Sequence, residues 1–366
     1  MKIKLFFLLL LSTVTFTQAQ FHTLTIPQAS NAVTETQRLG VTDITITYGS
    51  PALNGRDVWN NPYVIPQNGF PIAWRAGANI NTTLTFSTDV LIEGEQLAAG
   101  TYGFHVIPRG DTYTLLFAHN SQQWGSYYLD TVADITLRVD VMSKECPQTE
   151  KLDYRFINWT EYSVELGVEW ADKRIPFTVS VDLNKTVVES FRKELRGINT
   201  YHWQAWNDAA QWCLYHNTNM EEALVWANRS INGGFNGFAA NKNITNLSTK
   251  ARILKSMDRA NDVDGVIGEI RNLTLTADET SEFGHLMIQM EKYDVGIEGC
   301  TEGLKTYKDN LPIMIRRSVL FYYAGDAKKA VKDAKKALSL APVQLQPRLK
   351  VVISEMERGT YVYPYL

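Results

Sequence analysis

Apolar and polar residues alternate with a period of two over about residues 33–183. The stretch DITITYGSP places Ile44, Ile46 and Tyr48 on one side of an extended chain and threonines on the other. The same alternation recurs in TLTFS, TYGFHVIP, YTLLFA, ITLRVDVM, YSVELGVEW and IPFTVSVDL. This pattern is typical of strands that bury one face. Turn signals separate the stretches, which favours an antiparallel sandwich or barrel, and we expect a β-sandwich over residues 26–183.

The period changes after the last of these stretches. KTVVESFRKELRG has apolar residues at helical spacing, and Asn184 precedes it where a helix N-cap would stand. Helical patterns then continue along the chain. We place the domain boundary between residues 183 and 198 and expect an α-helical domain over residues 184–366.

One helical stretch, YYAGDAKKAVKDAKKALSLAP, has small residues at regular spacing. Gly325 is followed after five, nine and twelve residues by Ala330, Ala334 and Ala337, and Pro342 comes after seventeen. This layout resembles the second helix and exit of a tetratricopeptide repeat, in which small residues lie where paired helices touch.

Weaker copies of this pattern precede it. Aligned on the position of Ala330, they fall at Ala223, Val263 and Gly296, at intervals of 40, 33 and 34 residues. A period near 34 residues is that of tetratricopeptide-like repeats, which stack into a solenoid with a concave groove. We therefore expect a tetratricopeptide-like array to follow the β-sandwich.

The first residues have the order of a secretory signal peptide. Lys2 and Lys4 precede an apolar run over residues 5–11, and small residues end at Ala19. We expect cleavage after residue 19 and export to the periplasm or the extracellular space. No later stretch is apolar enough to cross a membrane, so we expect no transmembrane segment in the mature chain.

Charge and cysteine content narrow the class of protein. The 366-residue sequence carries a formal net charge of −3, which argues against a nucleic-acid partner, because such surfaces are basic. Cys146, Cys213 and Cys300 are too widely spaced for a disulfide framework. We expect three separate buried thiols.

The motifs of common enzyme classes are missing from the sequence. There is no G-x-S-x-G, G-x-x-x-x-G-K-[ST], H-E-x-x-H or G-x-G-x-x-G, and the six histidines never stand at helical metal-ligand spacing. We therefore assign no catalytic residue, no metal ligand and no cofactor. Whether the chain is an enzyme stays open at this point.

Polar and aromatic residues in the β-rich half are candidates for ligand binding. Arg56 follows the SPALNG turn, Arg75 and Asn79 lie in WRAGAN, His105 lies on a predicted strand, and Trp124 lies in QQWGSYY. Guanidinium groups clamp carboxylates or sulfates, an indole stacks on a flat ring, and imidazole serves as an acid or base near neutral pH. These residues predict a site for a small polar ligand in the β domain.

A structural role is the alternative, and we slightly favour it for Arg75 and Asn79. Gly77 suits a backbone conformation closed to other residues, so Arg75 would satisfy loop carbonyl groups and Asn79 would cap the turn. Glu165 and Glu169 share a strand face, and we expect both to be ordinary surface acids.

Several motifs occur in a specific order: LGVTDITITYGSPALNGRDVW, WRAGANINTTLTFSTDV, IEGEQLAAGTYGFHVIP, QWGSYY and DITLRVDV. Together they resemble an uncharacterised family of exported bacterial proteins, the domain of unknown function 2911, over residues 26–182. The resemblance implies a β-rich exported domain with a helical region behind it, and it implies no activity. One stretch departs from the family's compact G-x-x-V-P-Y segment and reads NNPYVIPQNGF.

Two functions remain open from the sequence. The first is a non-enzymatic binding or scaffold protein of the cell envelope, whose helical groove holds a protein or peptide partner. The alternative is a hydrolase, carbohydrate-active or otherwise, or a carbohydrate-binding module, with its site in the β domain. We expect the final aromatic stretch, YVYPYL, to dock back onto the last helices.

Overall fold

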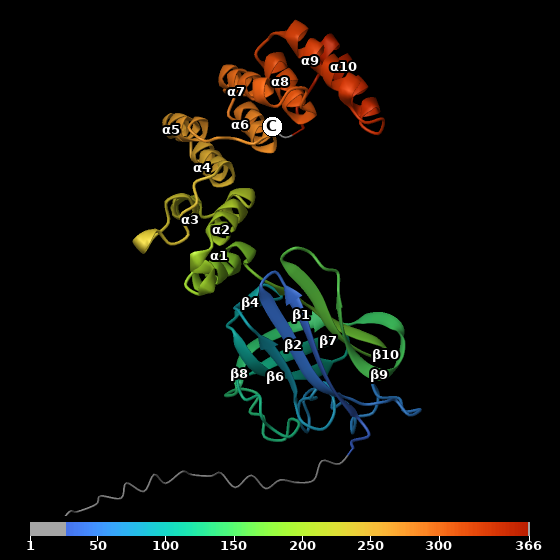
Figure 1. The fold of residues 1–366 in the computed structure, drawn as a ribbon. Coiled ribbons are helices and arrows are strands. Elements are labelled where there is room, and N and C mark those ends of the chain that lie inside the picture. The colour runs from blue at the N-terminus through green and yellow to red at the C-terminus, as the bar shows by residue number, and fades with distance from the viewer. Residues whose placement is uncertain (1–26, 365–366) are drawn as a thin grey trace, which may run out of the picture. The chain divides into compact units, whose positions relative to one another are not determined.

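The computed structural model describes residues 27–364 (Figure 1). The predicted signal peptide, residues 1–19, lies outside the described residues. Two compact units are present, one holding the strands and the other holding the helices. The strands precede all ten α-helices of the described chain, as the change from a period of two to helical spacing predicts.

The strands of the first unit form two sheets (Figure 1). In the first sheet the strand order is β1-β2-β3-β6-β7-β8, and in the second it is β5-β4-β10-β9. The pairs β2–β3, β3–β6, β6–β7, β7–β8, β4–β5 and β9–β10 are antiparallel. The strands are β1 (Asn31–Leu39), β2 (Thr42–Ser50), β3 (Thr82–Phe86), β4 (Val90–Ile92), β5 (Glu95–Leu97), β6 (Gly100–Arg109), β7 (Thr112–Ala118), β8 (Ile135–Met142), β9 (Lys144–Ile157) and β10 (Ser163–Ser180).

Aromatic side chains join the two sheets into a β-sandwich. The rings of Phe104 on β6 and Phe177 on β10 have centroids 5.6 Å apart, and Phe117 on β7 lies 6.0 Å from Phe177. Tyr48 on β2 lies 4.7 Å from Tyr154 on β9. All five rings are buried. Each such pair adds about 0.5–1.5 kcal/mol to the stabilisation from burial alone. Because the strand pairs named above are antiparallel and the two sheets pack face to face, the predicted antiparallel sandwich is confirmed.

Strand β10 spans two stretches that the sequence pattern treats separately. It bends at Ala171, where φ is +54° and the register with β9 shifts. The buried aliphatic and aromatic side chains have even numbers up to Trp170 and odd numbers from Ile175, and the register shifts place the extra residues of this irregularity on β9. Gly167 permits the bend, since a Cβ atom there would lie 3.1 Å from the carbonyl oxygen of Ile175 and from the Cα atom of Pro176.

The second unit begins with α1 (Leu183–Glu194) and a short 3₁₀ turn, η1 (Ile198–Tyr201). Asp182 is the N-cap of α1, because its side chain accepts a hydrogen bond from the backbone N–H of Lys185. The expectation that Asn184 is the N-cap was therefore wrong. Both residues have side chains suited to capping, and only the path of the chain out of β10 selects Asp182.

Four helical hairpins follow, and a single helix packs on the last of them (Figure 1). The first helices of successive hairpins begin at residues 203, 244, 277 and 311, and the final helix begins at 346. This spacing confirms the predicted repeats. The helices are α2 (Trp203–Tyr215), α3 (Met220–Asn232), α4 (Ile244–Ser256), α5 (Ala260–Arg271), α6 (Ala277–Gln289), α7 (Tyr293–Thr306), α8 (Leu311–Tyr323), α9 (Ala327–Leu340) and α10 (Gln346–Arg358), with a 3₁₀ turn, η2 (Phe235–Gly237), after α3.

Small or apolar residues occupy the repeated position of the array, as the aligned pattern predicts. Ala223, Val263, Gly296 and Ala330 lie on α3, α5, α7 and α9, and all four are buried. A Cβ atom on Gly296 would lie 2.7 Å from side-chain atoms of the neighbouring helices. Larger residues at these positions would push the helices apart.

Two further expectations concern membrane-spanning segments and the three cysteines. No helix of the described chain is long and apolar enough to span a bilayer. All three cysteines are free, and burial raises the pKa of Cys213 to about 11 and that of Cys300 to about 12. Cys146 is only half-buried, so the expectation of three buried thiols was wrong for this one residue.

Candidate functional site

The WRAGAN loop is held together by Arg75. Its Nη1 atom donates a hydrogen bond to the carbonyl oxygen of Asn79 at 2.5 Å, and its guanidinium lies over the ring of Tyr127 at 5.3 Å. Gly125, with φ of +60°, packs directly against the guanidinium and leaves no room for a side chain. Arg75 therefore ties its own loop to the QQWGSYY loop between β7 and β8.

Other side chains satisfy the rest of the loop. Asn79 has φ of +67°, and its Nδ2 atom donates to the carbonyl oxygen of Ser30 at 3.3 Å. The hydroxyl groups of Thr82 and Tyr154 both donate to the carbonyl oxygen of Ala76, at 3.1 and 2.8 Å. Buried carbonyl groups that would otherwise lack partners are thus paired, which accounts for much of this polar loop.

His105 lies beneath the same two loops and is completely buried. Its Nδ1 atom lies 2.7 Å from the hydroxyl oxygen of Ser126, and its Nε2 atom lies 3.4 Å from the side-chain nitrogen of Gln123. Burial lowers the pKa of His105 to about 4, and the positive charge of Arg75 acts in the same direction. The imidazole is therefore neutral at pH 7 and shielded from solvent.

Two buried polar atoms of this cluster have no hydrogen-bond partner among the described residues. They are Nδ2 of Asn81 and Oε1 of Gln123. The two residues contact each other through other atoms, because the backbone N–H of Asn81 donates to the carbonyl oxygen of Gln123 at 3.2 Å. We name the residues Arg75, Asn79, Asn81, His105, Gln123, Ser126 and Tyr127 the β cluster. Its two unpaired atoms give it capacity for two further hydrogen bonds.

The other sequence candidates differ in position. Trp124 lies in the loop of the β cluster, and its side chain is 56% exposed. Arg56 makes its hydrogen bonds within its own turn, to the carbonyl oxygens of Leu53 and Ala52. The structure thus brings four of the five candidate ligand residues to two adjoining loops and a strand, and it places Arg56 elsewhere.

Four members of the β cluster were not among the candidate ligand residues from the sequence: Asn81, Gln123, Ser126 and Tyr127. They carry common polar side chains without a spacing that marks them. Ser126 and His105 are 21 residues apart and come together only because β6 and the loop after β7 meet. No sequence signal could have identified this pair.

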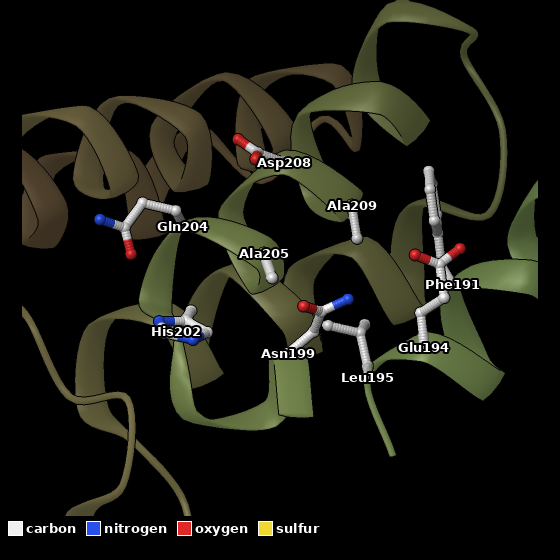
Figure 2. A pocket seen from close by; sticks show the side chains of 9 residues that line it. All are labelled: Phe191, Glu194, Leu195, Asn199, His202, Gln204, Ala205, Asp208 and Ala209. Carbon is white, nitrogen blue, oxygen red and sulfur yellow. The ribbon is translucent and has the colours of Figure 1, made fainter. Parts of the chain in front are cut away.

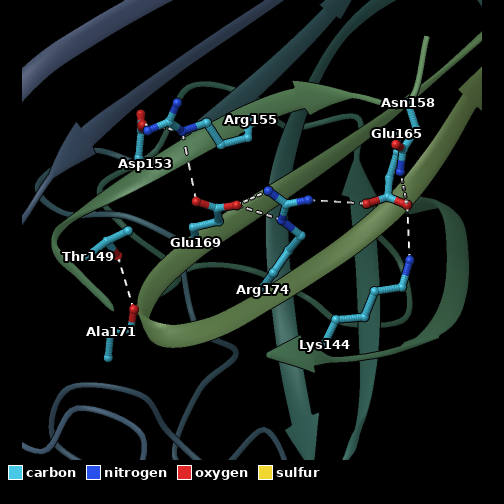
Figure 3. A network of polar contacts seen from close by, with 9 residues as sticks. All are labelled: Lys144, Thr149, Asp153, Arg155, Asn158, Glu165, Glu169, Ala171 and Arg174. Carbon is cyan, nitrogen blue, oxygen red and sulfur yellow. Dashed lines mark hydrogen bonds and ion pairs between the residues drawn. The ribbon is translucent and has the colours of Figure 1, made fainter. Parts of the chain in front are cut away.

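A second polar group lies at the bend of β10 (Figure 3). The guanidinium of Arg174 lies between two carboxylates, with Nε donating to Glu169 at 2.6 Å and Nη1 lying 3.5 Å from Glu165. Lys144 and Arg155 extend the network, at 3.0 Å from Glu165 and 3.8 Å from Glu169. Glu169 is only 5% exposed, so the expectation of an ordinary surface acid was wrong for it. The network fastens the two halves of β10.

A pocket of about 450 Å³ lies among α1, η1 and α2 (Figure 2). Its wall carries the polar side chains of Glu194, Asn199, His202, Gln204 and Asp208. Burial raises the pKa of Asp208.

Throughout residues 27–364, no group of three or more histidine, cysteine or acidic side chains is arranged to hold a metal ion.

The helical unit also contains an extended piece of its own chain. After α10, residues 361–364 return along α8, which we name segment 361–364. The backbone N–H of Tyr361 donates to the hydroxyl of Tyr322 at 3.2 Å, and the backbone N–H of Tyr363 donates to the hydroxyl of Tyr323 at 2.8 Å. The expected docking of the final aromatic stretch is confirmed for these residues.

The side chain of Tyr363 reaches a second helix. Its hydroxyl lies 2.6 Å from Nδ1 of His285 on α6 and accepts a hydrogen bond from Nη1 of Arg316 on α8. Burial lowers the pKa of His285 to about 4; nearby Glu282 opposes this shift, and Arg316 adds to it. At pH 7 the neutral imidazole accepts a hydrogen bond from the tyrosine hydroxyl, while the arginine donates one to the hydroxyl oxygen.

A cavity of about 520 Å³ lies beside segment 361–364. Its walls come from α6, α8, α9 and α10, together with the segment itself. The apolar side chains on its wall include Leu311, Pro312, Ile315, Leu345, Leu349 and Val352. We name this cavity and the surface under segment 361–364 the array groove.

Comparisons with known proteins give different matches for the β-rich unit and the helical unit. Residues 30–179 match the family described as "Protein of unknown function (DUF2911)". Curated proteins gave no match. Solved structures similar to the helical region include YrrB, described as a TPR protein with an unusual peptide-binding site, at 10% identity and a TM-score of 0.31, covering 47% of this chain and 86% of that one.

Two further solved structures are similar in the same region. A tetratricopeptide repeat protein from Parabacteroides merdae is 13% identical with a TM-score of 0.36, covering 48% of this chain and 68% of its own. MamA AMB-1 is 12% identical with a TM-score of 0.29, covering 43% and 83%. The resemblance predicted for the β-rich half is confirmed, because residues 30–179 match the DUF2911 model, and the helical array follows this stretch in the chain.

Proposed function

We propose that this chain is an exported, non-enzymatic binding or scaffold protein of the cell envelope. In this proposal a signal peptide (1–19) is removed, a β-sandwich domain (26–183) follows, and a tetratricopeptide-like domain (184–366) holds a peptide or protein partner. One observation carries the proposal: the array groove already accommodates an extended polypeptide, segment 361–364.

The contacts suit an extended peptide because they are hydrogen bonds to its backbone N–H groups. Two successive hydroxyl groups, of Tyr322 and Tyr323, accept hydrogen bonds from backbone N–H groups two residues apart. Residues two apart lie on the same side of an extended chain. Any extended segment can present such a pair, so the groove is not restricted by its backbone contacts to one sequence.

The groove also offers charge and apolar surface. Arg316 and Tyr323 are seven residues apart on α8, which places them on one face of the helix, about 10 Å apart along its axis. The adjoining cavity of about 520 Å³ is large enough for one or two side chains of a ligand. A peptide thus finds backbone acceptors, a cationic donor and an apolar pocket along one surface.

A panel of immobilised, C-terminally amidated peptides tests this function. The mature chain, residues 20–366, is applied beside its Tyr323→Phe variant, which loses one backbone acceptor, and a Tyr215→Phe control, whose ring is 85% exposed on α2. We expect reproducible binding of a subset of peptides that weakens in Tyr323→Phe alone. No binding by any of the three proteins or by a variant in which segment 361–364 is released by Tyr361→Ser/Tyr363→Ser would refute the proposal.

Export is tested separately. The proposal predicts that the chain purified from its native envelope begins near residue 20. N-terminal sequencing measures this directly, and an intact N-terminus in the cytoplasmic fraction would exclude an exported role.

The β cluster supports the alternative, a small polar ligand in the β domain. The specific observation is the pair of unpaired buried atoms, Asn81 Nδ2 and Gln123 Oε1, in the β cluster, whose loop also carries the exposed ring of Trp124. A thermal-shift screen with sugars, peptidoglycan fragments and metals checks it, because a ligand in excess raises the melting temperature. A shift that is lost in Arg75→Lys would favour this site.

A further inference from the structure

Segment 361–364 shows which side chains the array groove selects. The ring of Tyr361 packs edge-to-face on Tyr322, with centroids 5.5 Å apart. The ring of Tyr363 is almost fully buried, and its hydroxyl is held by both His285 and Arg316. The intervening Val362 is 74% exposed. The groove therefore contacts the first and third of these residues and leaves the middle one in solvent.

We propose that the partner of the array groove is an extended peptide with tyrosine at two alternate positions, Tyr-x-Tyr, and that segment 361–364 competes with it from within the chain. This inference rests on the proposed function, because it presumes that the groove binds peptides. It adds the chemistry of the partner and a means of control.

The second tyrosine determines specificity. Its hydroxyl both donates to a neutral imidazole and accepts from a guanidinium, so it satisfies two half-buried groups at once. Phenylalanine at this position would leave both groups without this partner. Such a loss weakens binding about tenfold to a hundredfold.

The first tyrosine contributes mainly through its ring. Its backbone N–H contacts Tyr322, and the same residue supplies the edge-to-face ring contact. Phenylalanine keeps this ring contact, so a peptide with phenylalanine first and tyrosine third should bind almost as well as the doubly tyrosine-containing peptide. The two positions are therefore distinguishable in a binding experiment.

Covalent attachment gives segment 361–364 an advantage over a free peptide. A short tether produces an effective concentration in the millimolar range. A free Tyr-x-Tyr peptide must displace the segment. Its apparent affinity for the intact chain is therefore the intrinsic affinity multiplied by the fraction of molecules in which the segment is released. Releasing the segment should raise that affinity at least tenfold.

The test uses the full mature chain, residues 20–366, with the segment released by a Tyr361→Ser/Tyr363→Ser double substitution. The probe is a fluorescein-labelled, C-terminally amidated Gly-Thr-Tyr-Val-Tyr-Pro peptide, which has the sequence of residues 359–364. Fluorescence anisotropy measures its binding. The matched control is Val362→Ser, which alters the same segment at an exposed position and keeps both anchors.

We expect the probe to bind the released variant at least tenfold more tightly than the wild type or the Val362→Ser control. Phenylalanine at the second tyrosine of the probe should weaken binding at least tenfold, and phenylalanine at the first should change it less than threefold. Adding Arg316→Met to the released variant should reduce the difference between tyrosine and phenylalanine at the second position, because only the contact with His285 then remains.

The outcomes separate this inference from the proposed function. If the released variant binds other peptides of the panel and not the Tyr-x-Tyr probe, the inference is wrong and the proposed function stands. If it binds none, both are wrong, provided its far-ultraviolet circular dichroism matches the wild type. Should the double variant unfold, Tyr363→Phe alone replaces it, and the same peptides compete against a chain whose second anchor is weakened.

Discussion

The hydroxyl of Tyr363 lies 2.6 Å from Nδ1 of His285, although 78 residues separate the two in the chain. This contact joins the end of the described chain to the first helix of the third hairpin. Arg316, on the next hairpin, donates to the same hydroxyl. One side chain thereby links two neighbouring hairpins of the array, which gives segment 361–364 a role in stability beside the binding role that we propose for it.

Tyr363→Phe in the full mature chain should lower the free energy of unfolding by about 1–3 kcal/mol. The change removes a hydroxyl and leaves two part-buried polar groups without it. Urea denaturation measures the loss. Tyr215→Phe, at an 85% exposed position, serves as the control and should change stability by no more than about 0.5 kcal/mol. Equal stability of the two variants would contradict this role.

His105 should make stability depend on pH below neutrality. Burial lowers its pKa from 6.5 to about 4, so between these values the unfolded chain binds a proton that the folded chain does not. The contribution is fully present above pH 6.5 and is lost as the pH falls towards 4. At pH 5 we expect about 2 kcal/mol less stability from this residue than at pH 7.

Urea denaturation at pH 7 and pH 5 checks this prediction in wild type and in His105→Asn. The variant should lose about 2 kcal/mol less on acidification, even if it is less stable at both pH values. His119→Gln is the control, because the side chain of His119 is 63% exposed. An unchanged pH dependence in His105→Asn would show that the imidazole is not buried in its neutral form.

Arg174→Met should destabilise the β-sandwich by about 3–5 kcal/mol, because it leaves Glu169 buried without its cation. The double variant Arg174→Met/Glu169→Met should recover most of the loss, since no buried charge remains. Lys144→Met, which removes a 60% exposed member of the same network, should cost less than about 1 kcal/mol. Guanidinium denaturation of the wild type, Arg174→Met, Glu169→Met and the double variant gives the coupling energy; additive losses would argue against the ion pair.

Arg75→Lys should lower stability by about 1–2 kcal/mol, because lysine keeps the charge and loses the planar contact with Tyr127 and the bond to the Asn79 carbonyl. Arg56→Lys is the matched control, since Arg56 contacts only carbonyl groups of its own exposed turn. Thermal unfolding compares the two. A larger effect for Arg56 would contradict the fastening role given to Arg75.

Local patterns predicted the β-rich half because burial of one strand face is a property of alternate residues. The same pattern also records the bend of β10, since the buried aliphatic and aromatic residues are even-numbered up to Trp170 and odd-numbered from Ile175. What the pattern could not give is that both stretches form one bent strand. This depends on contacts across the bend, such as the close approach of Gly167 to Ile175.

The contacts of the candidate site also fall into two kinds, those between neighbours in the sequence and those between distant elements. Arg75 and Asn79 lie in one loop, so their hydrogen bond follows from neighbours in the sequence. The contact of His105 with Ser126 requires a strand and a distant loop to meet. Residue type and spacing say nothing about such a pair, because polar side chains of this kind are common in any loop.

In the helical half, small residues at a period near 34 sufficed to predict stacked hairpins, because close helix contacts tolerate little else. The sequence alone thus determined the order of the two architectures, the alternation within the strands and the repeat of the helices. Tertiary structure alone decided that Glu169 is buried, that Asp182 caps α1, and that Tyr363 lies between His285 and Arg316. Periodicity records which face of an element is buried, whereas the partner of a particular side chain depends on how distant elements pack.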